Sequence, residues 1–251
     1  MAPYCFCRRG AEIDPDNVLI VPRGKPTMFY AIMMFGEPGK EIVYPNPGFP
    51  IYESLIHWSG AKPVPYALPE DRGFSFSAED VLSKITPATS LLIVNTPANP
   101  TGGVVPRSEM DALVAGLEQH PHVTILCDEI YSRQLYDGEE HVSILQYESV
   151  RDRAIMLDGW SKTYAMTGWR LGYGVWPSDL VAHAERLQIN SSSCANAATQ
   201  VAAIEAMRGP QGAVDEMLEA FDGRRKIIHE ELNAIPGFSC VMPKGAFYAF
   251  P

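Results

Sequence analysis

Short β-rich runs alternate with longer helical patterns along the first 175 residues of this 251-residue chain. This alternation constrains the fold more than any other feature, because parallel strands need long crossover connections, which are usually helices. It favours an α/β fold with a mostly parallel seven-stranded sheet and helices on both faces. The predicted strands are 18–21, 41–44, 62–66, 90–94, 123–127, 154–157 and 171–175, and the clearest helices between them are 26–35, 52–58, 77–85 and 107–119.

The pattern becomes helical after Pro177, with predicted helices at residues 178–187, 195–207 and 212–235. Pro236 and Gly237 then interrupt it, and two short β-like stretches follow at 238–242 and 246–250. We therefore expect residues 1–210 to form a large sheet domain. Residues 211–251 are expected to supply a linking helix and the beginning of a smaller α+β domain.

The charge balance is acidic, with a net charge of −10 and an isoelectric point near 5.1. This balance argues against a nucleic-acid partner, which would favour a basic face. No apolar stretch is long enough to span a bilayer, and near the first residue the arginines follow the apolar residues, unlike a secretory signal. We expect a cytoplasmic protein that binds neither nucleic acid nor membrane.

The five cysteines are odd in number and scattered, so we do not expect a disulfide framework. Cys5 and Cys7 have the spacing of half a metal site, but no second pair or histidine cluster completes it. We expect no metal site.

The run from Ser161 to Arg170 carries the strongest chemical signal. It places Lys162 directly after a hydroxyl and eight residues before an arginine that follows a glycine turn. An amine can condense with an aldehyde, and a hydroxyl and a guanidinium can anchor a phosphate tail nearby. The run therefore predicts a site for a phosphorylated aldehyde.

Three further motifs follow predicted strands. One is the run from Asn95 to Gly102, one is Asp128-Glu129-Ile130-Tyr131, and one is the turn Gly24-Lys25-Pro26. Ligand sites of open α/β sheets lie at the carboxyl ends of the strands, so we expect these motifs to meet there. Asp128 closes a buried strand and needs a cationic partner, whereas Glu129 is expected to face backbone groups or solvent. Free amides at the helix start after Gly24 would cradle a phosphate.

Together these motifs resemble those of the fold-type I, pyridoxal-phosphate-dependent aminotransferases of class I and II, the aspartate and aromatic aminotransferase group. The resemblance extends from Asn17 to Gly245-Ala246-Phe247-Tyr248. It implies pyridoxal 5'-phosphate as cofactor and amino-group transfer from an L-amino acid to a 2-oxo acid, through a lysine aldimine and a ping-pong mechanism. Aspartate or an aromatic amino acid with 2-oxoglutarate is the leading pair by family frequency. A homodimer is implied as well.

The resemblance assigns catalytic roles to Lys162, Asp128 and Tyr131. Lys162 would bind the cofactor aldehyde and move a proton between substrate and cofactor, which requires an amine that is partly neutral near pH 7. Asp128 would pair with the protonated pyridine nitrogen, and Asn99 and Tyr131 would bond the phenolic oxygen. The residues also allow other interpretations: a helix-capping Asp128, a turn residue at Asn99 and a core aromatic at Tyr131.

The remaining roles concern the ring face and the phosphate. Phe49 would stack on the cofactor ring. An aromatic in a Pro-Gly loop can alternatively cover the hydrophobic core without contacting a ligand. Phe49 and Asn99 would also contact the substrate. Ser161, Arg170, Gly24 and Lys25 would hold the phosphate, while a lysine such as Lys25 is also a common solvated surface charge.

The chain departs from the family pattern in two respects. Arg23 stands where the family usually has a glycine, so it would either add charge for the phosphate or distort the turn. We also expect the chain to be a fragment, because relatives carry a segment before the first strand and a long portion after residue 248. The arginine for the substrate carboxylate and the tyrosine given to the partner subunit would lie in those portions. The same portions complete the substrate site, so we expect the isolated chain to bind the cofactor poorly.

Two alternative functions remain open. A carbon-sulfur β-lyase uses the same cofactor for a different bond, and pyruvate release from cystine analogues would identify it. A non-enzymatic, aminotransferase-like ligand-sensing domain of a transcription regulator would normally bring a basic DNA-binding module, and none precedes Met1 in this sequence.

Overall fold

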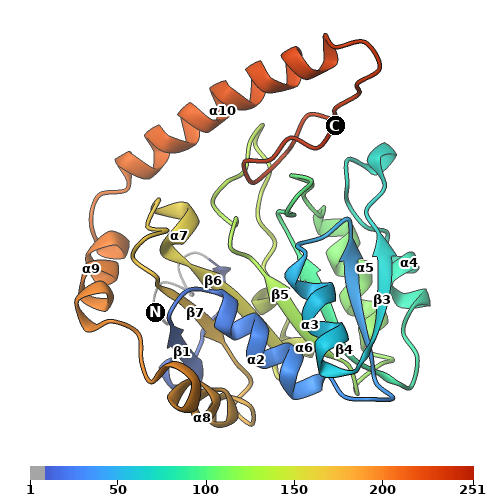
Figure 1. Cartoon of the computed structure of the whole chain (residues 1–251), viewed down its shortest axis with the longest axis vertical. Helices are drawn as coiled ribbons and strands as arrows, with labels where there is room; N and C mark the ends of the chain where they lie inside the picture. The colour runs from blue at the N-terminus through green and yellow to red at the C-terminus, as the bar shows by residue number, and fades with distance from the viewer. Residues whose placement is uncertain (1–8) are drawn as a thin grey trace.

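A computed structural model describes residues 9–251, and Figure 1 shows a sheet flanked by helices with one long helix standing apart from it. The predictions for Cys5 and Cys7 fall outside these residues. All seven predicted strands are present, each within two residues of its predicted ends. The strands are β1 (Val18–Val21), β2 (Glu41–Asn46), β3 (Lys62–Ala67), β4 (Thr89–Asn95), β5 (Thr124–Asp128), β6 (Ala154–Gly159) and β7 (Gly172–Val175).

The strands form one seven-stranded sheet in the order β1-β7-β6-β5-β4-β2-β3. β7 is antiparallel to both of its neighbours, β1 and β6, and every other neighbouring pair is parallel. The predicted mostly parallel sheet is therefore confirmed. Because every strand except β7 runs the same way, the carboxyl ends of β1, β2, β4, β5 and β6 lie along one edge of the sheet.

Helices cover both faces of the sheet, as predicted. α2, α3 and α8 contribute to the core on one face, and α4, α5 and α6 contribute to the core on the other. The helices are α2 (Lys25–Phe35), α3 (Ile51–Ser59), α4 (Ala78–Ser83), α5 (Arg107–Leu117), α6 (Glu148–Arg151), α7 (Trp160–Thr163), α8 (Val181–Ser192), α9 (Ala197–Arg208) and α10 (Gly212–Asn233).

The central strand β4 shows why this arrangement suits the sequence. Successive side chains of a strand point to opposite faces, and β4 is apolar at every position from Leu91 to Val94. Leu91 and Ile93 pack into the core beneath α2 and α3, while Leu92 and Val94 pack into the core beneath α4 and α5. A strand buried on both faces in this way requires helices on both sides.

The C-terminal region differs from the prediction. The chain after α10 forms no strand, and only one isolated antiparallel bridge joins Leu135 to Gly245. The Gly245 and Ala246 amides donate to the carbonyls of Gly102 (2.9 Å) and Gln134 (2.8 Å). These carbonyls belong to loops rather than to a strand, so no neighbouring strand is available to extend the pairing. The two β-like stretches at 238–242 and 246–250 were therefore wrongly predicted as strands.

The helix α10 rises from α9, and the segment after it returns across the carboxyl edge of the sheet (Figure 1). Arg225, a buried residue of α10, forms an ion pair with Asp137 (2.7 Å) and donates to the Pro243 carbonyl (2.8 Å). These contacts attach α10 to the returning segment and to the loop after β5. The predicted division between residues 1–210 and 211–251 stays a prediction.

Two further observations concern residues 9–251. None of their helices combines the length and the apolar character that crossing a membrane requires. Within the same range, histidine, cysteine, aspartate and glutamate side chains do not gather into a group of three or more that could hold a metal ion.

Candidate functional site

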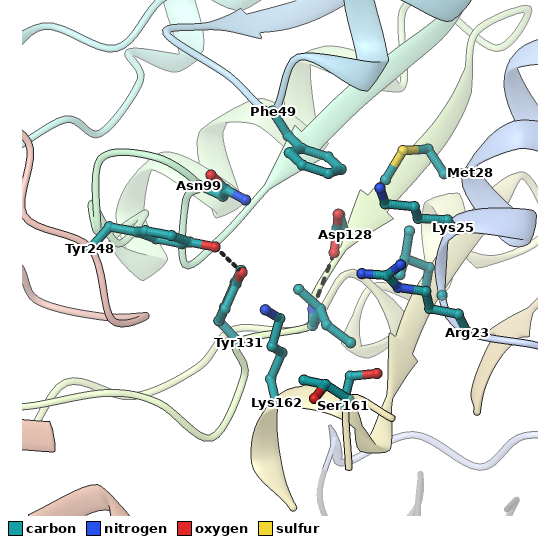
Figure 2. Close-up of a pocket in the computed structure, with 14 residues that line it drawn as sticks. Arg23, Lys25, Met28, Phe49, Asn99, Asp128, Tyr131, Ser161, Lys162 and Tyr248 are labelled. Carbon is teal, nitrogen blue, oxygen red and sulfur yellow. Dashed lines mark hydrogen bonds between the residues drawn. The ribbon is translucent and has the colours of Figure 1, made fainter. Parts of the chain in front are cut away.

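A cavity of about 200 Å³ opens at the carboxyl edge of the sheet (Figure 2). The loops and helix starts that follow β1, β2, β4, β5 and β6 all contribute to its wall. Every predicted site residue except Arg170 lines this cavity. The full lining is Arg23, Gly24, Lys25, Met28, Phe49, Asn99, Asp128, Ile130, Tyr131, Leu157, Ser161, Lys162, Thr167 and Tyr248.

Asp128 is the last residue of β5 and the only acidic residue in the described lining of the cavity. Its carboxylate accepts hydrogen bonds from the Tyr52 hydroxyl (2.8 Å) and the Ile130 amide (3.2 Å). Within residues 9–251 it forms no ion pair. Burial raises the pKa of Asp128 to about 6, although these two hydrogen bonds pull it down. The site therefore holds a buried carboxylate that would be stabilised by a cation.

The prediction that Glu129 faces backbone groups or solvent is only partly right. Glu129 is fully buried, and its carboxylate pairs with Arg9 and with His141 Nε2 (2.8 Å). It also accepts hydrogen bonds from the Ser143 hydroxyl (2.9 Å) and the Ile144 amide (3.0 Å). The sequence gives no sign of these partners, because each of them lies at least twelve residues away and is brought close only by the fold.

Lys162 lies on α7, the short helix that directly follows β6. Its ammonium group lies 4.6 Å from the centre of the Phe247 ring and 5.4 Å from that of Tyr131. Burial and the nearby positive charge of Arg23 lower the pKa of Lys162, and Asp128 opposes this shift. A half-buried lysine with a lowered pKa is the kind of amine that can act as a nucleophile or a base.

Hydroxyl groups line the side of the cavity next to Lys162. The Tyr131 and Tyr248 hydroxyls are 2.5 Å apart and share a hydrogen bond, with Asn99 beside them (Figure 2). Burial raises the pKa of Tyr131 well above its usual range, and the hydrogen bond with Tyr248 adds to this rise. Tyr131 is thus a buried, neutral aromatic whose hydroxyl lies at the cavity, which agrees both with the predicted site role and with a core aromatic that has its hydroxyl at the rim.

Asn99 and Tyr248 differ in how readily the sequence identifies them. The Asn99 amide donates to the Asn95 side chain (2.8 Å), so Asn99 is a turn residue and a cavity residue at once. Tyr248 is a cavity residue that the sequence analysis does not predict, although it belongs to the motif Gly245-Ala246-Phe247-Tyr248. It reaches the cavity because the segment after α10 folds back over the sheet.

Phe49 is half-buried at the rim of the cavity, with its ring turned inward (Figure 2). It packs edge-on against Tyr52, with ring centres 5.9 Å apart, and the Lys25 ammonium lies 5.1 Å from its ring centre. The Phe49 ring thus borders the cavity, which suits the predicted stacking role.

Groups suited to an anion occupy the side of the cavity nearest β1. Gly24 precedes α2, and a side chain there would collide with Leu157, whose Cδ1 would lie 2.7 Å from the added carbon. The Ser161 hydroxyl is buried and has no hydrogen-bond partner within residues 9–251. Lys25 and Arg23 point into the cavity from this side (Figure 2). Unpartnered donors at a helix start are typical of an anion site.

Arg170 lies outside the lining of this cavity. It borders a neighbouring open hollow with Gly168, Trp169, Asn196 and Thr199 of α9, and its guanidinium donates to the Thr167 carbonyl. Its positive charge still contributes to lowering the pKa of Lys25. Its predicted phosphate contact therefore stays a prediction.

Comparison with known proteins identifies similar chains. The family described as aminotransferase class I and II matches residues 1–251. An aspartate aminotransferase of Rhizobium meliloti strain 1021 is 36% identical over 242 residues, which cover 96% of this chain and 59% of that protein. The crystal structure of an aspartate aminotransferase from Rhizobium meliloti superposes with a TM-score of 0.95 at 34% identity, covering 99% of this chain and 62% of that one.

A second solved structure, an aromatic aminotransferase from Pyrococcus horikoshii, gives the same TM-score of 0.95 at 32% identity, covering 100% of this chain and 67% of that one. The chain thus spans about 60% of the length of the curated relatives that it matches. It covers 59% of one aspartate aminotransferase and 61% of another.

Proposed function

The chain belongs to the class I and II aminotransferase family, and we propose that it binds pyridoxal 5'-phosphate and transfers an amino group from an L-amino acid to a 2-oxo acid. One observation carries this proposal: a half-buried lysine and a buried carboxylate without an ion pair in the described chain line the same cavity. Lys162 would be the catalytic amine. Asp128 would be the anion that pairs with the cofactor ring.

The residues of the cavity fit this cofactor group by group. Asp128 offers a carboxylate to a protonated pyridine nitrogen, and its pKa of about 6 fits a group that lacks its cation. Tyr131 and Asn99 offer donors to the phenolic oxygen. Lys162 offers an amine to the aldehyde, and the unpartnered hydroxyl of Ser161 offers a donor to the phosphate.

The remaining contacts complete this assignment. Phe49 would cover one face of the ring. Gly24 and Lys25 would hold the phosphate at the start of α2, with Arg170 as a further cation near them. Ile130, a member of the motif Asp128-Glu129-Ile130-Tyr131, also lines the cavity.

The division of labour in the reaction follows from these positions. When bound, the cofactor supplies a ring that withdraws electrons from the α-carbon of an amino acid. Lys162 would remove the proton from that carbon and return it to the cofactor side, which its lowered pKa favours because more of the amine is neutral. Asp128 would keep the proton on the ring nitrogen. Tyr131 and Asn99 would hold the ring oxygen by hydrogen bonds, and Tyr248 would position the Tyr131 hydroxyl.

We propose aspartate as amino donor and 2-oxoglutarate as acceptor, because the similar proteins include several aspartate aminotransferases. Phe49 and Asn99 would contact this substrate beside the ring. We also propose that the active form is a homodimer. Trp58 and Phe29 pack against each other on the surface, with ring centres 6.2 Å apart, and Trp58 is 70% exposed. An exposed aromatic pair suits a subunit contact.

The proposal can be tested by trapping the lysine. The purified chain is treated with pyridoxal 5'-phosphate and borohydride, digested and analysed by mass spectrometry. We expect the mass increase on the peptide that contains Lys162 and its loss in Lys162→Arg. Lys62→Arg, which changes an exposed lysine paired with Glu41, is the matched control. A label spread over surface lysines, with none on Lys162, would contradict the proposal.

Transfer itself is measured as glutamate formed from aspartate and 2-oxoglutarate. Pyruvate release from cystine analogues without glutamate formation would favour the β-lyase reaction instead. A chain that is labelled at Lys162 but forms neither product would retain the cofactor site and lack the proposed activity.

A further inference from the structure

Arg23 occupies the turn between β1 and α2 in a conformation that is unusual for arginine. Its backbone φ is 87°, in the left-handed region that favours glycine. The turn lies directly against β7: a side-chain carbon on Gly172 would lie 2.4 Å from the Gly24 amide nitrogen and 2.5 Å from the Arg23 carbonyl carbon. The close contact fixes the position of the Arg23 backbone. This contact therefore sets the direction of the Arg23 Cα–Cβ bond.

The guanidinium of Arg23 points into the cavity from the side of Lys25, across from Tyr131 and Tyr248 (Figure 2). Within residues 9–251 it makes neither a hydrogen bond nor an ion pair. A half-buried guanidinium offers five donors in a planar arrangement that matches the oxygens of a phosphate. An arginine directed into a cavity with no protein partner in the described chain is therefore available to an anionic ligand.

Other cations surround the same space. The charge of Arg23 contributes to lowering the pKa of Lys162, of Lys25 and of Arg170, in each case together with burial. The one acidic residue in the described lining, Asp128, has Tyr52 and Ile130 as its partners instead. Like charges held together in this way repel one another unless an anion lies between them. The arrangement favours a ligand with more than one negative charge.

We propose that the Arg23 side chain binds the phosphate of the cofactor, in addition to the donors of Ser161 and of the start of α2. This inference rests on the proposed function, because it takes pyridoxal 5'-phosphate as the ligand of the cavity. A phosphate monoester carries between one and two negative charges near pH 7 and accepts paired hydrogen bonds from a guanidinium. Arg23 then adds a second cationic side chain to a turn that already supplies backbone amides and Lys25.

The test compares two aldehydes that differ only in the phosphate. Binding of pyridoxal 5'-phosphate and of pyridoxal is measured by absorbance titration for the purified chain, for Arg23→Gln and for Arg23→Gly. We expect both variants to bind pyridoxal 5'-phosphate roughly tenfold more weakly or worse, the loss typical of one hydrogen bond to a charged group. Their affinity for pyridoxal should stay within about twofold of the parent, since that ligand lacks the phosphate.

Two variants and a melting-temperature measurement separate loss of phosphate binding from a change in folding. Arg23→Gly places glycine where φ is 87°, so it should fold at least as well as the parent while still losing phosphate affinity. Arg107→Gln, which removes one positive charge at the exposed start of α5, should leave both affinities unchanged. Without any aldehyde, inorganic phosphate should raise the melting temperature of the parent more than that of Arg23→Gln.

The outcomes are distinct. Equal losses for both aldehydes, no loss for either, or tighter binding of pyridoxal 5'-phosphate by Arg23→Gly would overturn the inference. So would a change confined to the KM for the amino acid, which would place the guanidinium on the substrate. If the parent chain captures both aldehydes and only the phosphate dependence fails, the proposed function stands. A parent chain that captures neither would overturn both.

Discussion

Asp128 and Glu129 are neighbours in the sequence, both are buried, and their carboxylates lie in opposite electrostatic environments. Asp128 faces the cavity, where burial raises its pKa to about 6. Glu129 faces the protein interior, where burial also acts to raise the pKa but Arg9 and His141 outweigh it and lower the pKa to about 2. The same strand end thus presents one carboxylate to a ligand site and one to a buried ion network.

The difference shows that two adjacent buried carboxylates can have different functions. The network around Glu129 is completed by the chain itself, since Arg9 also pairs with Asp158 at the end of β6. It joins the end of β5, which carries Asp128, to the end of β6, which directly precedes the helix of Lys162, and so contributes to their spacing. Asp128, in contrast, lacks a cationic partner in the described chain. Its buried carboxylate therefore destabilises the folded state until a cation binds beside it. The interior network is expected to govern stability, and the cavity carboxylate is expected to govern ligand binding.

The largest effect is expected from breaking the interior network. Glu129→Gln would remove a charge that compensates the buried Arg9, and removing one partner of a buried ion pair typically costs about 3–5 kcal/mol. We expect the free energy of unfolding, measured by urea denaturation, to fall by that order. Glu53→Gln, on the exposed surface of α3, should change it by less than about 0.5 kcal/mol. Equal effects of the two substitutions would remove the distinction between the two regions.

The stability of the folded chain is expected to depend on pH through Asp128. The pKa of Asp128 is higher in the folded chain, about 6, than its ordinary value of 3.8, so the folded state binds more protons between these pH values. Without the cofactor, this residue's contribution to stability should decline as the pH rises from about 4 to 6, by roughly 3 kcal/mol in total. Asp128→Asn should lack that decline. The measurement is the difference in unfolding free energy between parent and variant at each pH.

Added pyridoxal 5'-phosphate sharpens the same comparison. A cation beside Asp128 lowers its pKa, so the ligand should reduce the decline of unfolding free energy with pH in the parent chain. In Asp128→Asn the dependence of unfolding free energy on pH should stay the same with and without the ligand. A parent chain with the same slope as the variant, with or without ligand, would show that Asp128 is ionised at no cost.

A smaller effect is expected on Lys162. Asp128 raises the pKa of Lys162, so Asp128→Asn should lower it further and make the amine neutral at lower pH. Glu129→Gln, if it folds, should leave this pKa unchanged because its charge is already compensated by Arg9. The pH dependence of acetylation at Lys162, read by mass spectrometry with Lys226 as an exposed reference, measures the shift. Equal shifts in the two variants would contradict the separation of cavity and network.

The smallest effect is expected from Tyr248→Phe. This change removes the hydroxyl that lies 2.5 Å from that of Tyr131, and the loss of one neutral hydrogen bond costs about 1 kcal/mol. The free energy of unfolding, measured by urea denaturation, should fall by about that amount. Tyr147→Phe, at an exposed hydroxyl paired with Asp111, is the control and should change the free energy of unfolding by less than about 0.5 kcal/mol.

The sheet was predictable because its evidence is local. Most strands contain a short apolar run bounded by turn residues, and the sequence of β4 already shows that this strand is buried on both faces. The gathering of Gly24, Phe49, Asn99, Asp128 and Lys162 was predictable as well, since parallel strands place their carboxyl ends at one edge. Other features depend on partners distant in the sequence. The segment 238–250 has β-like composition and no strand to pair with, and Glu129 is buried only because Arg9 and His141 reach it.

The sequence by itself determined the order of the strands along the chain, the helices between them and the family to which the chain belongs, because periodicity and motif spacing are properties of consecutive residues. The tertiary structure decided which face of the β5 end receives a compensating charge and that Tyr248 returns to the cavity. It also decided that the Arg23 guanidinium points inward from a left-handed turn. Electrostatics and side-chain direction depend on distances between residues far apart in the chain, and only the folded backbone fixes those distances.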